Sequence, residues 1–177
     1  VVANNIGMGN VCLVPFSYLF MRGQGIKIFS LVAQICRNED FLIKNLDKDN
    51  IDTSSYEGAI VFDPKPGIYF EPIAVMDYAS LYPSSMISEN ISHDSIVLVK
   101  EYDLDDNLIS ETGNKEYDNL SEYDYNNIEY DVYKLVVEDG KEEKKKVGYK
   151  ICRFAENKNG DKSLLPRILK RLIKARK

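Results

Sequence analysis

Cysteine, histidine and long apolar runs are all scarce in this sequence of 177 residues. Its three cysteines, Cys12, Cys36 and Cys152, lie far apart, whereas disulfide frameworks and zinc ribbons need paired or closely spaced cysteines. The single histidine, His93, has no visible partner set and is expected at the surface. No run of about 18 apolar residues could span a bilayer, and no basic segment leading into an apolar core begins the chain. We therefore expect a soluble protein in a reducing compartment.

Positive charge is also scarce, except at the end of the chain. The net charge is −5, but residues 162–177 contain seven basic residues and no acidic one. A surface that binds anions must therefore be local, and this segment is its best candidate. Its apolar residues recur at helical spacing: Leu165, Ile168, Leu169, Leu172 and Ile173. The pattern predicts an amphipathic helix, and a solvated basic face is the ordinary interpretation of its lysines and arginines.

Apolar patterns in the rest of the chain predict an α+β fold. Residues 13–38 favour two packed helices with a break at residues 23–25, and the second helix has one shared apolar face: Ile26, Phe29, Ala33 and Cys36. Residues 38–55 are polar and are expected to form a linker or surface loop. Strands are predicted at residues 59–62 and 73–77, around a turn rich in proline and glycine. The second strand is apolar at successive positions, so we expect it to be covered on both faces.

Asp77 ends this second strand. A helix is predicted shortly after it, at residues 81–90, with Ser80 as its N-cap and Pro83 in its first turn. The free backbone amides at the helix start favour an anion such as phosphate. A carboxylate beside that anion is repelled unless a cation lies between them, and Mg²⁺ binds both groups. A capping or turn aspartate is the commoner explanation of such a residue, so the local pattern leaves both interpretations open.

Residues 77–84, DYASLYPS, resemble the D-x-x-S-L-Y-P-S signature called motif A in family B DNA polymerases. Three further segments resemble parts of that family in the family's order: SYLFMRGQGIKIFSLV (17–32), YEGAIVFDPKPGIY (56–69) and SLLPRILKRLIKARK (163–177). Together these matches cover roughly two thirds of the chain. The resemblance is to delta-type members, and the acidic insertion favours those of large eukaryotic DNA viruses.

The resemblance implies a fragment of a multi-domain, right-hand polymerase. Residues 1–50 would be a helical segment following the exonuclease domain, and residues 51–100 the Y-x-G-A segment and palm motif A. Residues 101–150 would be an acidic insertion and a β-hairpin, and residues 151–177 the palm-to-fingers connection and first fingers helix. The chain opens on Val1 and stops within a helical pattern at Lys177, so we expect an excerpt that is inactive alone because the second catalytic aspartate lies outside it.

Two features of residues 101–155 depart from the compact form of the family. Residues 101–131 contain eleven acidic residues and one lysine, so we expect a loop that points away from DNA. Residues 130–155 then predict a hairpin of two alternating strands around Asp139-Gly140, with a longer turn through the charged run as the alternative.

The resemblance also implies roles for individual residues. Asp77 would bind two catalytic Mg²⁺ ions, and the carbonyl of Tyr78 would bind one of them. The backbone amides of Ser80, Leu81 and Tyr82 would hold the triphosphate of the incoming nucleotide.

The resemblance implies a second role for Tyr82 and roles for four further residues. Tyr82 would also act as a steric gate that excludes ribonucleotides, although a tyrosine in a helix's first turn is usually a packed aromatic residue. Arg176 would contact the triphosphate from the fingers. Tyr56, Gly58 and Ala59 would contact the template strand.

The expected partners are primer-template DNA, deoxynucleoside triphosphates and a sliding-clamp processivity factor bound outside this chain, with no membrane. The expected location is intracellular, in the nucleus or at a cytoplasmic viral replication site. A non-catalytic, polymerase-like scaffold that binds DNA or proteins remains an alternative. An unrelated α+β interaction module with a chance motif does not account for the ordered matches.

Overall fold

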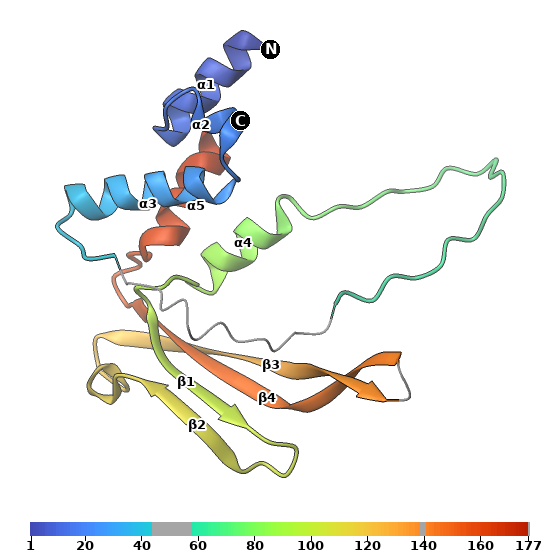
Figure 1. Ribbon diagram of the computed structural model, residues 1–177, viewed down its shortest axis with the longest axis vertical. Coiled ribbons are helices and arrows are strands. Elements are labelled where there is room, and N and C mark those ends of the chain that lie inside the picture. Colours follow the sequence, from blue (N-terminus) through green and yellow to red (C-terminus); the bar gives the residue numbers. More distant parts are fainter. Residues whose placement is uncertain (44–57, 139–140, 177) are drawn as a thin grey trace.

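Helices gather at one end of a twisted antiparallel sheet in the computed structural model, which describes residues 1–43, 58–138 and 141–176 (Figure 1). The helices are α1 (Val2–Cys12), α2 (Tyr18–Met21), α3 (Gly25–Asn38), α4 (Leu81–Ser88) and α5 (Leu164–Arg176), with a short 3-10 helix, η2 (Lys115–Tyr117). None of the helices in these ranges has the length and apolar character that crossing a bilayer requires. Because the described ranges contain both these helices and an antiparallel sheet, the predicted α+β class is confirmed.

The sheet has four strands in the spatial order β2-β1-β4-β3. Their bounds are β1 (Ile96–Tyr102), β2 (Leu108–Gly113), β3 (Tyr123–Glu138) and β4 (Lys141–Asn157). The predicted hairpin around residues 139–140, which themselves lie outside the described ranges, is confirmed because Glu138 is paired with Lys141. The alternative of a longer turn is wrong, since the charged run pairs along the ladder as far as Tyr133 and Lys146.

The acidic segment 101–131 is not the predicted loop. It contains the end of β1, all of β2, η2 and the first part of β3. Its carboxylates form ion pairs with lysines of the sheet and the adjoining turn. Glu111 is 3.6 Å from Lys100 and 2.6 Å from Lys115. Asp131 is 2.7 Å from Lys146. Cross-strand pairs of opposite charge stabilise a sheet, so a high density of acidic residues does not exclude strands here.

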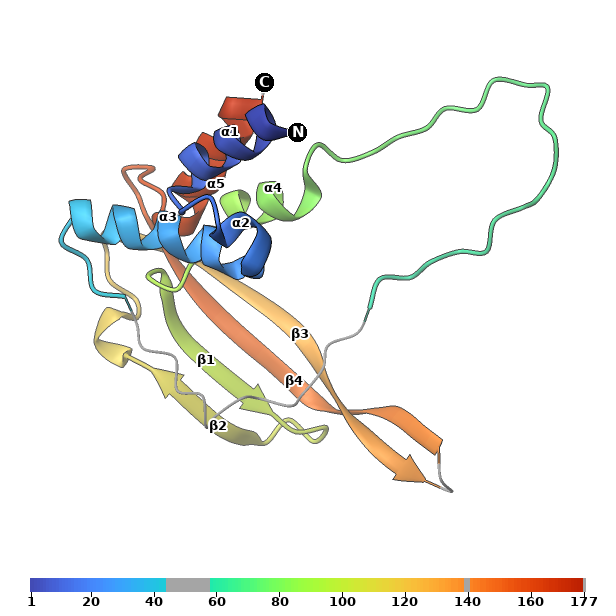
Figure 2. The ribbon, with the colours of Figure 1, turned by 45° about the horizontal axis from the view of Figure 1, so that its top comes forward.

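The two strands predicted at residues 59–62 and 73–77 are also wrong. Residues 58–80 form an extended segment that projects away from the rest of the chain in both views (Figures 1 and 2). Among the described residues, no backbone hydrogen bond joins residues 58–79 to another backbone group. The predicted cover is missing as well, since Val75 is 90% exposed and Met76 is 92% exposed. A strand needs a pairing partner, and the described part of this chain supplies none.

The helical core lies between α3 and α5. It consists of five buried residues: Leu31, Val32, Cys36, Leu164 and Ile168. The predicted apolar stripe of α5 is confirmed, because Leu165 and Leu172 also pack against this cluster. The predicted face of α3 is wrong in part, since Phe29 is 54% exposed. Cys36 of the predicted face is buried in the cluster, together with Leu31 and Val32.

Candidate functional site

The motif around Asp77 lies where the extended segment 58–80 enters α4. The helix begins at Leu81 with Pro83 in its first turn, as predicted, but ends at Ser88 rather than residue 90. Ser80 occupies the N-cap position in a left-handed conformation, with φ 55° and ψ 61°. Its side chain makes no capping hydrogen bond to a described residue, so the predicted capping role of Ser80 is wrong.

A different serine stabilises this junction. The Ser84 hydroxyl donates a hydrogen bond to the Ala79 carbonyl at 2.7 Å, and the Ser84 amide donates to the Ser80 carbonyl at 2.9 Å. These two bonds fold the turn back onto the first turn of α4. The amides of Leu81 and Tyr82 belong to that first turn, where backbone N–H groups have no partner within a helix.

The side chains of the motif are open to solvent. Asp77 is exposed, and Tyr78 and Tyr82 are 76% and 80% exposed. Tyr82 is therefore not the packed aromatic residue that the general pattern favours. Among the described residues, no group of three or more histidine, cysteine, aspartate or glutamate side chains could hold a metal ion. The donors at this junction are thus one carboxylate, Asp77, and nearby carbonyl oxygens.

The other predicted site residues lie apart from this junction along the chain. Gly58 and Ala59 are exposed at the far end of the extended segment, and Tyr56 lies outside the described residues. Arg176 is the last residue of α5, at the opposite end from the part of this helix that meets α4. The structure therefore groups Asp77 to Tyr82 at one junction and leaves the remaining residues on other elements.

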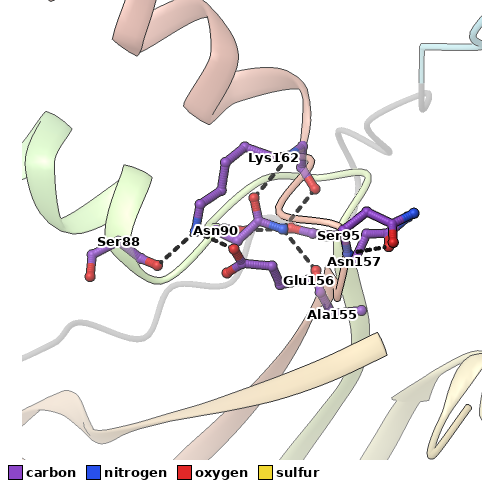
Figure 3. Close-up of polar contacts among 9 residues, drawn as sticks. Ser88, Asn90, Ser95, Ala155, Glu156, Asn157 and Lys162 are labelled. Atoms are coloured by element: carbon purple, nitrogen blue, oxygen red, sulfur yellow. Dashed lines mark hydrogen bonds and ion pairs between the residues drawn. The ribbon is translucent and has the colours of Figure 1, made fainter. Parts of the chain in front are cut away.

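A polar network that the sequence did not predict joins the end of α4 to the start of α5 (Figure 3). Asn90 is 1% exposed. Its Nδ2 donates to the Ala155 carbonyl at 2.8 Å and to the Ser163 Oγ at 2.9 Å, while its Oδ1 accepts from the Ser163 amide at 2.9 Å. Asn90 and Ser163 are 73 positions apart, so their contact cannot be read from neighbouring residues. The polar residues within 90–95 are the one local sign of a helix cap in the sequence.

Two further side chains complete the cap of α5. Asp94 Oδ2 accepts from the Leu164 amide at 3.1 Å, and Ser92 Oγ accepts from the Leu165 amide at 3.2 Å. The Ser92 hydroxyl in turn donates to Asp94 Oδ1. The amides of three successive residues at the start of α5 are therefore satisfied by one remote segment, which we call the capping segment (residues 90–94).

Charge pairing holds α3 against α5 near the same place. The Arg167 guanidinium donates to both carboxylate oxygens of Glu39, at 2.8 and 2.6 Å. This hydrogen bonding lowers the pKa of Glu39 and raises the pKa of Arg167. Burial, with further contributions from the nearby Asp94 and Glu39 charges, raises the pKa of the Cys36 thiol, which therefore stays neutral in the core.

Comparison with known proteins gives one consistent result. The sequence model of DNA polymerase family B matches residues 14–177. The chain is 56% identical to a DNA polymerase of Pyramimonas orientalis virus and 48% identical to one of Phaeocystis pouchetii virus, over its whole length in both cases. It is 41% identical, over 54% of its length, to the DNA polymerase delta catalytic subunit of Caenorhabditis elegans. It spans 13%, 18% and 9% of these three proteins, respectively. No solved structure matches the chain.

Proposed function

This chain belongs to DNA polymerase family B, and from that premise we propose that the whole polymerase extends a DNA primer with deoxynucleoside triphosphates. In this reaction the primer 3′-oxygen attacks the α-phosphate, the bond between that phosphorus and the bridging oxygen breaks, and pyrophosphate leaves. The observation that carries the proposal is the motif at residues 77–84, in a chain that matches the family model over residues 14–177.

We propose Asp77 as a ligand for two Mg²⁺ ions and the Tyr78 carbonyl as a ligand for one of them. Their oxygen atoms are the hard ligands that Mg²⁺ prefers, and Mg²⁺ commonly combines one or two carboxylates with substrate phosphates. The exposed Asp77 carboxylate fits as one part of such a site, and at least one further carboxylate would come from outside the described residues. Bound Mg²⁺ would supply neutralisation of the phosphate charges.

The incoming nucleotide would bind at the first turn of α4. The amides of Ser80, Leu81 and Tyr82 would donate to its triphosphate, as backbone groups at a helix start can. The Tyr82 ring would lie under the sugar and exclude a ribonucleotide by clashing with its 2′-hydroxyl. Arg176, at the end of α5, would contact the triphosphate from a second side, where its charge can pair with phosphate oxygens.

The remaining assignments complete the proposal. Tyr56, Gly58 and Ala59 would contact the template strand. The four parts of the chain would be the helices after the exonuclease domain (1–50), the palm with motif A (51–100), an acidic insertion with the hairpin (101–150), and the connection to the first fingers helix (151–177). Primer-template DNA is the proposed partner, and a sliding clamp would bind elsewhere on the polymerase.

Primer extension with Mg²⁺ and deoxynucleotides tests the metal role. We expect the native polymerase to extend the primer, and Asp77→Ala to abolish extension while primer-template binding persists. Asp63→Ala is the matched control, because Asp63 is another exposed aspartate of the same extended segment, and it should extend normally. Equal extension by native and Asp77→Ala proteins would refute the assignment. Binding of DNA without extension by the native protein would favour the scaffold alternative.

Competition between nucleotides tests the gate. We expect Tyr82→Ala to incorporate ribonucleotides more readily relative to deoxynucleotides, because the proposed clash with the 2′-hydroxyl is removed. Tyr78→Ala removes a neighbouring exposed ring to which we assign no side-chain role, and it should keep the native preference. A gate role for Tyr82 is refuted if the two variants discriminate alike.

A further inference from the structure

We propose that Asn90 is a positioning residue that sets the angle between α4 and α5 and thereby governs how tightly the incoming nucleotide binds. The role in nucleotide binding rests on the proposed polymerase function. Asn90 itself would touch neither the nucleotide nor DNA. It would act through the two helices that carry the proposed contacts, with the motif A amides on α4 and Arg176 on α5.

The Asn90 side chain is buried and hydrogen-bonded on both its amide nitrogen and its carbonyl oxygen. It is 1% exposed and makes three hydrogen bonds of 2.8 to 2.9 Å, to the Ala155 carbonyl of β4 and to two atoms of Ser163. Its backbone carbonyl also accepts from the Ser95 hydroxyl at 2.6 Å. A buried amide with this many partners has one favourable position, because any displacement leaves polar groups without partners.

These hydrogen bonds join the end of α4 to the start of α5. Asn90 lies two residues beyond the end of α4 at Ser88, and its partner Ser163 immediately precedes α5 at Leu164. Helix starts are normally capped by a residue adjacent in sequence. Here the cap of α5 comes from the capping segment, which is continuous with α4. The end of one helix and the start of the other are therefore joined through a few side chains.

A second side chain, Lys162, also joins the end of α4 to the start of α5. The Lys162 ammonium donates to the Ser88 carbonyl at 3.2 Å and pairs with the Glu156 carboxylate at 2.6 Å. Figure 3 shows this lysine reaching across to the last turn of α4 while Asn90 lies between the two helices. Two contacts at different points resist rotation better than one, so the angle between the helices is restrained.

The geometry of α5 explains why this angle matters. A helix that runs from Leu164 to Arg176 is about 18 Å long, so a tilt of about 10° at its start moves its end by about 3 Å. A displacement of only about 1 Å in a positioning group can cost about 100-fold in rate. Loosening the Asn90 network would thus displace Arg176 from a nucleotide held at α4 without altering any residue that contacts it.

The variant to test is Asn90→Gly in the whole polymerase. Asn90 has a left-handed backbone, with φ 52°, so glycine removes the side chain without adding backbone strain. The matched control is Asn119→Gly, because Asn119 is also left-handed, with φ 59°, but is exposed and accepts a single bond from Arg153 at 2.8 Å. It lies between β2 and β3 along the chain, and its side-chain bond is to a residue of β4 rather than of α4 or α5.

Two measurements on these variants decide the proposal. We expect Asn90→Gly to raise the KM for deoxynucleotide about 10-fold, with a smaller change in kcat and unchanged affinity for primer-template DNA, while Asn119→Gly keeps native values. We also expect faster hydrogen exchange at the amides of residues 163–165 in Asn90→Gly only. An unchanged KM overturns the proposal even if exchange is faster, because the network would then be structural alone.

A milder variant covers the case in which Asn90→Gly does not fold. Ser163→Ala removes one acceptor of Asn90, and a raised KM in this variant supports the proposal while a native KM overturns it. The polymerase function is tested separately by Asp77→Ala. Extension that persists in Asp77→Ala refutes the proposed site, whereas a native KM in the Asn90 and Ser163 variants refutes only the positioning role.

Discussion

Truncation of one core residue, Ile168→Ala, tests whether α5 owes its stability to packing on α3. Ile168 is 3% exposed and belongs to the cluster with Leu31, Val32, Cys36 and Leu164. The substitution removes three buried carbon atoms, worth about 2.4 kcal/mol. The cavity left behind adds about 1 kcal/mol where neighbours relax only in part. We therefore expect the packed state of α5 to lose about 3 kcal/mol.

Hydrogen exchange along α5 in the whole polymerase measures this loss locally, which avoids a single unfolding transition for a multidomain protein. A loss of about 3 kcal/mol corresponds to exchange faster by on the order of 100-fold. The matched control is Lys170→Ala, because Lys170 is exposed on the same helix and alanine keeps its helix propensity. Comparable exchange rates in the two variants would refute the packing argument.

Two further predictions concern the sheet and the acid range. Gly148→Ala should weaken the pairing of β1 with β4, because a Cβ there would lie 2.0 Å from the Tyr102 carbonyl oxygen. Hydrogen exchange at the amides of β4 should become faster, by an amount that corresponds to a loss of about 3 kcal/mol of stability. Gly7→Ala, with nothing within 4 Å, is its control. Glu39 has a lowered pKa because Arg167 donates to its carboxylate, so its contribution to stability is present at neutral pH and is lost as pH falls through that lowered pKa. In Glu39→Gln, protection of α3 and α5 amides from hydrogen exchange should therefore not fall with pH in this way. A pH dependence of protection identical to that of the native protein would contradict the role of the Glu39–Arg167 pair.

Local patterns predicted those elements whose cause is local. Proline in the first turn identified α4, apolar spacing identified α5, and alternation around Asp139-Gly140 identified the hairpin. The motif at residues 77–84 was also found without a structure, since it consists of adjacent residues. By contrast, α1 was not predicted, and the buried face of α3 was predicted only in part, because where α5 packs decides which apolar residues of α3 are covered.

The strand errors have a common physical reason. Residues 59–62 and 73–77 have the composition of strands but no pairing partner among the described residues, whereas the acidic residues of 101–131 pair with strands and lysines that the composition did not reveal. Strand formation depends on a second segment, and its hydrogen bonds are not encoded in the residue types of one segment alone. For the same reason the role of Asn90 was not predicted, because its partner Ser163 is 73 positions away.

By itself, the sequence determined the family resemblance, the order of its motifs and the residue types available at the junction of Asp77 and α4, because each of these depends on neighbouring residues. Only the tertiary structure decided that the acidic segment joins the sheet, that α5 covers Leu31 rather than Phe29, and that α4 and α5 meet through Asn90. Those contacts join residues far apart in the chain, and their stability comes from burial and hydrogen bonds that exist only once the elements pack.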